Sequence, residues 1–351
     1  METFDVAVIG GGQSGLAAAH ALRARGVTPV VLEASGRAAG SWPHYYDSLA
    51  LFSPARHSSL PGMPFGGDPD RYPHRDEVVD YLQRYAARLD ADIRTGTRVM
   101  EVRPGAGGYE VVLEGGGRLA AKAVVAASGS FGNPYRPPLP GLENFGGEVL
   151  HAAEYRAPEP FADRHVVVVG AGNSAVQIAT ELSSQSRVTL ATRAPVKFAR
   201  QRLLGRDLHA WLAVSGLDAA PLGRLLPRPP GQPVLDGGRY RAALAAGSPA
   251  RKALFTAADG TKVTWSDGLI EEVDAIVLAT GYRPDLPYLA PLGTLHAAGR
   301  PLHRGGLSTV RPRLAYLGLE WQRSLSSNSL RGVGRDAAHV AHRLTSTLAN
   351  R

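Results

Sequence analysis

Two glycine-rich turns of the same kind, in different parts of the chain, constrain the fold more than any other feature of the sequence. The first turn, residues 10–15, reads GGGQSG and follows an apolar run at residues 4–9. Apolar side chains then recur at helical spacing, at Leu16, Ala19 and Leu22. A strand, a tight glycine turn and a helix in this order are typical of a dinucleotide-binding fold, in which backbone N–H groups hold a pyrophosphate.

An acidic residue distinguishes this turn from an ordinary glycine-rich loop. A second apolar run, residues 30–32, ends directly at Glu33. In dinucleotide-binding proteins an acid at this place accepts a hydrogen bond from a ribose hydroxyl and repels a 2′-phosphate. The first site therefore predicts FAD. The residues expected to hold it are Gly10, Gly12, Gln13, Ser14, Gly15 and Glu33.

The second turn, residues 170–175, reads GAGNSA and follows the valine run at residues 166–169. Alanine at its third position still allows a helix to pack closely on a strand. The next strand-like run leads into Thr192 and Arg193 rather than an acid, and a guanidinium suits a 2′-phosphate. The second site therefore predicts NADPH. Its expected residues are Gly170, Gly172, Asn173, Ser174, Thr192 and Arg193.

The remaining segments fit one domain inserted into another. Three alternating runs between residues 98 and 125 predict a small β-meander that feeds a strand ending at Ser128 and Gly129. Residues 273–278 predict a buried parallel strand, residues 314–317 a last strand, and the pattern from Leu330 a final helix.

The predicted fold class is therefore α/β, with two Rossmann-like domains and an architecture like that of the flavoprotein disulfide reductases. An FAD domain spans residues 1–155 and 283–351, and an NADPH domain spans residues 156–282.

Composition excludes several classes of protein. The 351 residues fit about two to three domains. Cysteine is absent, which excludes disulfides, cysteine-ligated metals and thiol redox pairs. The net charge of +8 comes mainly from scattered arginines without a basic stripe, so nucleic acid is not an expected partner. The eleven histidines show no ligand spacing such as HExxH, so no metal is expected.

The sequence also bears on location. No apolar run approaches the roughly 18 residues that a membrane helix needs, and Met1 leads into a strand pattern without a leader-like apolar segment. We therefore expect a cytoplasmic protein that does not associate with a membrane. A homodimer remains open.

Four ordered motifs resemble the flavin-containing monooxygenases, the class B flavoprotein monooxygenases. They are the paired glycine turns, the Gly40, Ser41 and Trp42 stretch, the FxGxxxHxxxY pattern at residues 145–155, and the DxxxLATGYxxxxP pattern at residues 274–287. The resemblance covers nearly the whole chain. Residues 51–55 and 60–64 are most similar to short bacterial members that are CzcO-like or associated with arsenic operons.

The resemblance implies the chemistry and further site residues. NADPH reduces FAD, and a C4a-hydroperoxyflavin passes one atom of O2 to a small organic substrate, most often at nitrogen or sulfur. His151, Tyr155 and Ser53 are the implied catalytic residues. Further implied cofactor contacts are Gly40, Ser41, Trp42, Val99, Ser128, Gly129, Thr280, Gly281, Tyr282 and Glu320.

Three departures from the family pattern bear on the mechanism. No asparagine occurs near residues 51–53, where larger relatives place one beside the flavin. Ala39 replaces a glycine, and the chain has Gly318, Leu319 and Glu320 where the wider group has a Gly-Asp pair. How tightly oxygen transfer is coupled to NADPH use therefore stays open, as does the substrate. A Baeyer–Villiger reaction on a ketone, an NADPH-dependent flavoprotein reductase or oxidase, and a flavin-binding sensor are the alternatives.

Overall fold

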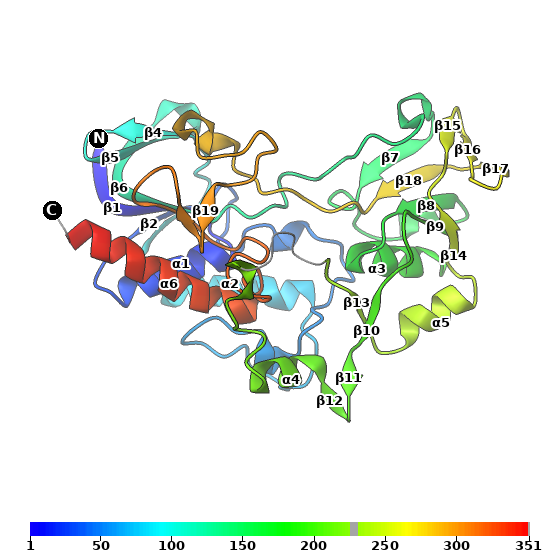
Figure 1. The fold of residues 1–351 in the computed structure, drawn as a ribbon, viewed down its shortest axis with the longest axis horizontal. Helices are drawn as coiled ribbons and strands as arrows, with labels where there is room; N and C mark the ends of the chain where they lie inside the picture. The colour runs from blue at the N-terminus through cyan, green and yellow to red at the C-terminus, as the bar shows by residue number, and fades with distance from the viewer. Residues whose placement is uncertain (225–230, 350–351) are drawn as a thin grey trace.

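The computed structural model describes residues 1–224 and 231–349 and consists of two α/β units that share one continuous chain (Figure 1). Both termini lie in the unit that contains the first glycine turn. No helix within the described residues is long and apolar enough to cross a membrane.

The first unit is built on a nine-stranded sheet in the order β19-β20-β21-β6-β1-β2-β3, with β5 also pairing with β6 and β4 with β5. The core pairs β6-β1, β1-β2, β2-β3 and β21-β6 are parallel, whereas β4 and β5 form the predicted antiparallel meander. The strands are β1 Glu2–Ile9, β2 Val30–Leu32, β3 Asp92–Arg94, β4 Val99–Gly105, β5 Gly108–Leu113, β6 Arg118–Ala126, β19 His303–Arg304, β20 Leu307–Ser308 and β21 Leu314–Tyr316.

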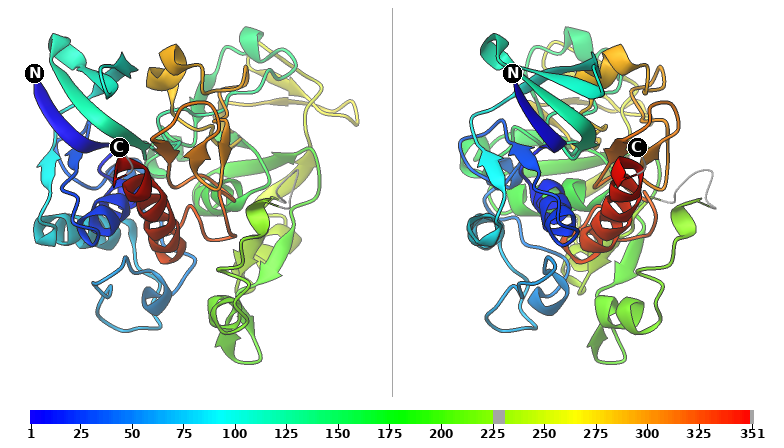
Figure 2. Two further views of the ribbon diagram at one scale, coloured as in Figure 1. Left: turned by 60° about the vertical axis from the view of Figure 1, so that its left-hand side comes forward. Right: turned by 90° about the vertical axis from the view of Figure 1, so that its left-hand side faces the viewer.

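Side chains of β1 alternate between the two faces of this sheet, as the period of a strand requires. Val6 and Val8 pack against the helices, and Ala7 and Ile9 pack toward the meander on the opposite face. The helices of the first face are α1 Gln13–Arg23, α2 Arg75–Arg88 and α6 Leu330–Ala349. Figure 2 shows α1 and α6 side by side under the sheet, so the two ends of the chain share one core.

The second unit is built on five parallel strands in the order β14-β9-β8-β18-β7. Val166 and Val168 of β8 pack with α3, whereas Val167 and Val169 pack on the other face with Trp265. Trp265 is therefore a core residue. These elements are β7 Glu148–His151, β8 His165–Val169, β9 Arg187–Thr192, β14 Ala250–Ala253, β18 Ala275–Leu278, α3 Asn173–Leu182 and α5 Arg239–Ala245, with the small sheet β15 Ala257–Asp259, β16 Lys262–Thr264 and β17 Ile270–Glu272.

An extension of the second unit projects at the bottom of Figure 1 and carries α4 Leu208–Val214. Its strands are β10 Phe198–Arg200, β11 Arg202–Leu203, β12 Arg206–Asp207 and β13 Val234–Asp236. Within the described residues, the short 3-10 helices are η1 Trp42–His44, η2 Ala55–His57, η3 Glu114–Gly116, η4 Leu142–Asn144, η5 Glu159–Phe161, η6 Leu222–Arg224 and η7 Pro287–Leu292.

Two chain segments connect the units, and they run side by side. Tyr135 N donates to Gly281 O, Arg283 N donates to Asn133 O, and Asp285 N donates to Gly129 O, each at 2.9 Å. The two crossings therefore form one hydrogen-bonded connection rather than two independent linkers.

The first boundary lies earlier than the expected residue 155. Strand β7, Glu148–His151, pairs with β18 in the second sheet, and Phe145 packs into the core of that unit. The FxGxxxHxxxY pattern thus belongs mainly to the second unit. The spacing of apolar residues in such a segment does not reveal which of two parallel sheets it joins.

Candidate functional site

One large cavity, of about 1430 Å3, is lined by both glycine turns and by residues of both units. Most of the residues predicted for the site line it. They are Gly10, Gly12, Gln13, Ser14, Glu33, Gly40, Ser41, Trp42, Ser53, Val99, Ser128, Gly129, Gly172, Asn173, Ser174, Gly281, Tyr282 and Glu320. The predicted residues outside its lining are Gly15, His151, Tyr155, Gly170, Thr192, Arg193 and Thr280.

The first glycine turn has the close backbone packing that a pyrophosphate site needs. Gly10 has a φ of +107°, and a Cβ on Gly15 would lie only 1.7 Å from the Gly10 carbonyl oxygen. Helix α1 begins after Gly12 with no acidic residue in its first turn, so its N-terminus can accept an anion. These residues fit the pyrophosphate of FAD.

Glu33 is buried and held by backbone donors at the end of β2. Its Oε2 accepts from Gly11 N at 2.6 Å, and its Oε1 accepts from Ser35 N at 2.8 Å. A carboxylate offers about four lone-pair sites, so it keeps capacity for a ribose hydroxyl. The carboxylate therefore lies where the glycine pattern predicts it, with its orientation fixed by the backbone.

Gln13 joins three separate parts of the first unit at the cavity wall. Its Oε1 accepts from Trp42 Nε1 at 3.2 Å, and its Nε2 donates to Asn328 O at 2.8 Å, just before α6. At the same wall, a Cβ on Gly318 would lie 2.1 Å from Ser14 Oγ. The start of α1, the Trp42 segment and the chain leading into α6 are thus locked together around the cavity.

The second glycine turn packs as tightly as the first. Gly170 has a φ of +149°, and a Cβ there would lie 2.4 Å from the Ala279 carbonyl oxygen. Asn173 begins α3 and accepts from Leu235 N through its Oδ1 at 3.3 Å. At the end of β9, Thr192 is buried and Arg193 is exposed, and no ion pair of Arg193 occurs within residues 1–224 and 231–349. These residues fit a nicotinamide dinucleotide.

The two crossing segments carry five further predicted cofactor contacts, Ser128, Gly129, Thr280, Gly281 and Tyr282. Ser128 Oγ donates to Asp285 O at 2.6 Å, and Thr280 Oγ1 donates to Tyr135 O at 2.5 Å. Tyr282 lines the cavity and stacks on Phe131 with ring centroids 5.5 Å apart. Ser128 and Thr280 therefore fasten the connection between the units, and Tyr282 forms the wall beside it.

His151 is fully buried and does not line the cavity. Its Nδ1 accepts from Ala153 N at 3.1 Å, so Nε2 carries the proton and donates to Gly281 O at 3.1 Å. Burial lowers the pKa of His151, which favours this neutral form at pH 7. The imidazole thus fixes the carbonyl of Gly281, a residue that does line the cavity.

Tyr155 is also buried away from the cavity. Its hydroxyl donates to Glu181 Oε2 in α3 at 2.9 Å, and its ring packs near Tyr46 and Phe161. Burial raises the pKa of Tyr155, and the Glu181 carboxylate raises it further. The structure brings Ser53 into the cavity lining but does not bring His151 and Tyr155 there with it.

The sequence patterns missed a cluster at the opposite wall. Asp207 accepts from His209 Nδ1 at 2.8 Å, from Tyr72 OH at 2.6 Å and from Gln201 Nε2 at 2.7 Å. His209 is buried and lines the cavity, where its ring stacks on Phe52. In the sequence, only the Asp-x-His spacing of Asp207 and His209 marks this cluster. That spacing does not predict a site, because only the fold brings His209 to the cavity.

The fold, and the two glycine turns that line one cavity, fit a flavoprotein that also uses a pyridine nucleotide. The pattern of the pyridine nucleotide-disulphide oxidoreductase family matches residues 7–213. The chain belongs to this family, and within it to the flavin-dependent monooxygenases, which use FAD and NADPH.

Three similar proteins support this assignment. The CzcO-like oxidoreductase of Geobacillus kaustophilus is 32% identical over 96% of this chain and 97% of its own length. The indole-3-pyruvate monooxygenase YUCCA1 of rice is 33% identical over 95% of this chain and 89% of its own length. The structure of a flavin-containing monooxygenase from Stenotrophomonas maltophilia is 32% identical, with a TM-score of 0.88 over 99% of this chain and all of that one.

Proposed function

We propose that the protein is a cytoplasmic, NADPH-consuming monooxygenase that transfers one oxygen atom from O2 to nitrogen or sulfur of a small organic substrate. The observation that carries the proposal is the single cavity lined by Gly12 of the first turn and by Gly172 and Asn173 of the second. A shared cavity lets two cofactors and a substrate meet without passing through bulk water.

The residues of this chain would mainly bind the cofactors, orient the substrate and exclude water from the cavity. The first glycine turn and Glu33 would hold FAD, and the second turn would hold NADPH. Reduced FAD would supply the electrons that activate O2 for transfer. Ser53 is a cavity residue whose Oγ lies 2.9 Å from Ser58 Oγ, so its hydroxyl is fixed in orientation. Leu51 and Phe52 beside it present apolar surface to the same space.

Oxygen transfer at a carbonyl is the second candidate. It is favoured by the similarity to rice YUCCA1, whose name gives indole-3-pyruvate, a 2-oxo acid, as its substrate. Tyr155 does not help to separate the two, because its hydroxyl is bound to Glu181 outside the cavity. A panel of a sulfide, a tertiary amine, a ketone and a 2-oxo acid, with products identified by mass, tests the proposal. A sulfoxide or N-oxide supports it, whereas an ester or a decarboxylated product as the only product contradicts it.

Replacement of His151 should weaken coupling without loss of FAD. His151→Ala removes the hydrogen bond to Gly281 O, worth about 0.5–1.5 kcal/mol, which corresponds to a roughly two- to tenfold change in an equilibrium. We expect the ratio of hydrogen peroxide to oxygenated product to rise by about that factor. His151→Gln, which can place an N–H near the same carbonyl, should restore most of the coupling. If His151→Ala keeps the wild-type ratio, the segment only connects the two units.

A further inference from the structure

The residues that line the cavity include an arginine with one buried donor that has no hydrogen-bond partner among the described residues. Arg331 lies in the first turn of α6 and lines the cavity. Its Nε donates to Asp218 Oδ1 at 3.0 Å, which orients the guanidinium. Its Nη1 is buried and has no hydrogen-bond partner among the residues that the structure describes. A buried donor without an acceptor destabilises a protein, and more so when it is charged, so this atom needs an explanation.

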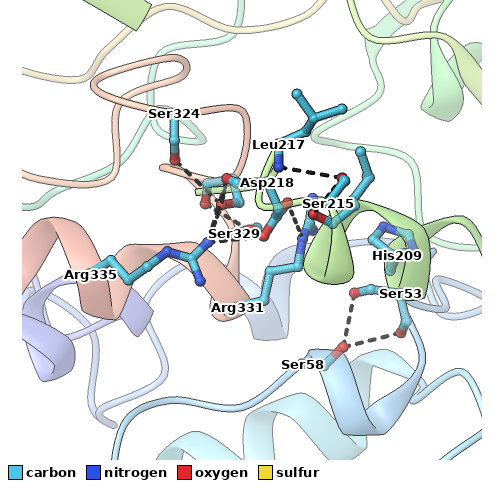
Figure 3. A network of polar contacts seen from close by, with 12 residues as sticks. Ser53, Ser58, His209, Ser215, Leu217, Asp218, Ser324, Ser329, Arg331 and Arg335 are labelled. Atoms are coloured by element: carbon cyan, nitrogen blue, oxygen red, sulfur yellow. Dashed lines mark hydrogen bonds and ion pairs between the residues drawn. The ribbon is translucent and has the colours of Figure 1, made fainter. Parts of the chain in front are cut away.

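Arg331 shares its acidic partner with a second arginine. Asp218 accepts from Arg331 and also from Arg335 Nη2 at 2.9 Å, so one carboxylate faces two guanidiniums (Figure 3). Burial raises the pKa of Asp218, but the two arginines outweigh this effect and hold the pKa below its usual value. The cluster of Asp218, Arg331 and Arg335 therefore carries an excess of one positive charge, and of its two arginines only Arg331 lines the cavity.

His209 of α4 lines the same cavity. Asp207 accepts from its Nδ1, and Nε2 has no partner within residues 1–224 and 231–349. Figure 3 shows Arg331, His209 and Ser53 in one small region. In its neutral form Nε2 of His209 accepts a hydrogen bond from an N–H or O–H group.

Apolar side chains line the same cavity as these polar groups. Leu212 of α4 and Leu325 and Leu330 near the start of α6 line the cavity, together with Leu51 and Phe52. Arg331 and His209 both line the cavity, but neither belongs to a glycine turn predicted to bind a nucleotide. A cation set among apolar groups suits a ligand with one anionic group and an apolar body.

We propose that Arg331 binds the carboxylate of an organic-acid substrate, with His209 as a second polar contact and the neighbouring leucines holding the rest of the molecule. The proposal rests on the proposed function in one respect, namely that the oxygenated substrate occupies this cavity. The binding claim can be tested without oxygen transfer.

The test uses the oxidised protein with FAD bound and follows the flavin absorbance as ligand is added. The probes are phenylacetate, 3-phenylpropanoate and indole-3-acetate, each compared with its neutral amide. A charge-assisted pair is worth about 1.5–3 kcal/mol, so the carboxylate should bind roughly ten- to a hundredfold more tightly than the amide. Arg331→Gln should bring that ratio close to one, and Arg331→Lys should restore part of it.

Arg335→Gln is the matched control, because it also removes one ion pair to Asp218 but does not alter a cavity-lining residue. It should keep the wild-type ratio. FAD content and the Kd of NADP+ should be unchanged in Arg331→Gln, which separates a substrate carboxylate from a cofactor phosphate. An equal affinity for acid and amide in the wild type, an unchanged ratio in Arg331→Gln, or no binding of any of the three acids would overturn the proposal. None of these results depends on whether oxygen is transferred.

Discussion

Replacement of Gly12 by valine should yield folded protein that lacks FAD. Gly12 has a φ of −80°, which valine can adopt, and a Cβ there would lie 3.3 Å from Gly40 Cα, so only a small shift is needed. The added methyl groups would occupy cavity space at the N-terminus of α1, where we expect the pyrophosphate. A loss of about 3 kcal/mol corresponds to roughly a hundredfold weaker binding, so the purified protein should be nearly colourless.

Gly172→Val is the matched control at the second turn. Gly172 also lines the cavity and has a φ of −92°, and no atom lies within 4 Å of a Cβ placed there. This variant should keep its FAD and lose affinity for NADPH. For both variants, circular dichroism checks the folding, the flavin released on denaturation measures the FAD content, and titration with NADPH measures its affinity. Full flavin content in Gly12→Val, or loss of flavin from Gly172→Val alone, would show that the two sites are assigned in the wrong order.

Replacement of Arg193 by alanine should remove the preference for NADPH over NADH. Arg193 is exposed at the end of β9 and has no ion pair within the described part of the chain, so its guanidinium is free to meet a 2′-phosphate. One charge-assisted hydrogen bond is worth about 1.5–3 kcal/mol, so KM for NADPH should rise about ten- to a hundredfold, whereas KM for NADH should hardly change.

The ratio of kcat/KM for the two nucleotides is the measurement that decides this prediction. Lys197 and Arg200 lie nearby in the sequence and are also exposed, so they can reduce the size of the effect. Arg187→Ala, at the opposite end of β9, removes an equal charge and should leave the ratio unchanged. Equal use of NADH and NADPH by the unmodified protein would contradict the assignment of Arg193.

The sequence predicted the strand, glycine turn and helix at both places because their signals are local. Gly10 and Gly170 adopt positive φ values, and Gly15 meets the chain so closely that a side chain cannot fit. Both constraints, the positive φ values and the close backbone packing, act within a few residues. They therefore produce a glycine pattern that is recognisable from the sequence alone. The near-continuous apolar runs of β1 and β8 likewise show that both strands are buried.

Other parts of the fold depend on contacts that the sequence does not reveal. Strand β7 joins the second sheet because it pairs with β18, more than a hundred residues later in the chain. The family motif predicts catalytic roles for His151 and Tyr155, but both side chains are buried outside the cavity lining, where they bond to Gly281 O and Glu181. Those roles remain predictions.

The sequence also did not predict that Arg331 and Asp218 lie near His209, because this arrangement depends on contacts between distant parts of the chain. These three residues come from α4, from the segment after α4 and from α6, and each looks like an ordinary surface or helix residue in the sequence. Only the packing of the extension against the start of α6 brings them to one end of the cavity. Residues without a shared motif thus form this wall of the cavity.

The most direct test of the central claim is an isotope measurement of oxygen transfer. The protein with FAD bound is supplied with NADPH and 18O2 in the presence of methyl phenyl sulfide, trimethylamine or phenylpyruvate, and products are analysed by mass. We predict that one atom of 18O enters a product for each NADPH consumed, apart from a fraction lost as hydrogen peroxide. If NADPH is consumed and all the 18O appears as peroxide or water with every substrate, the protein is an NADPH oxidase and does not transfer oxygen to an organic substrate.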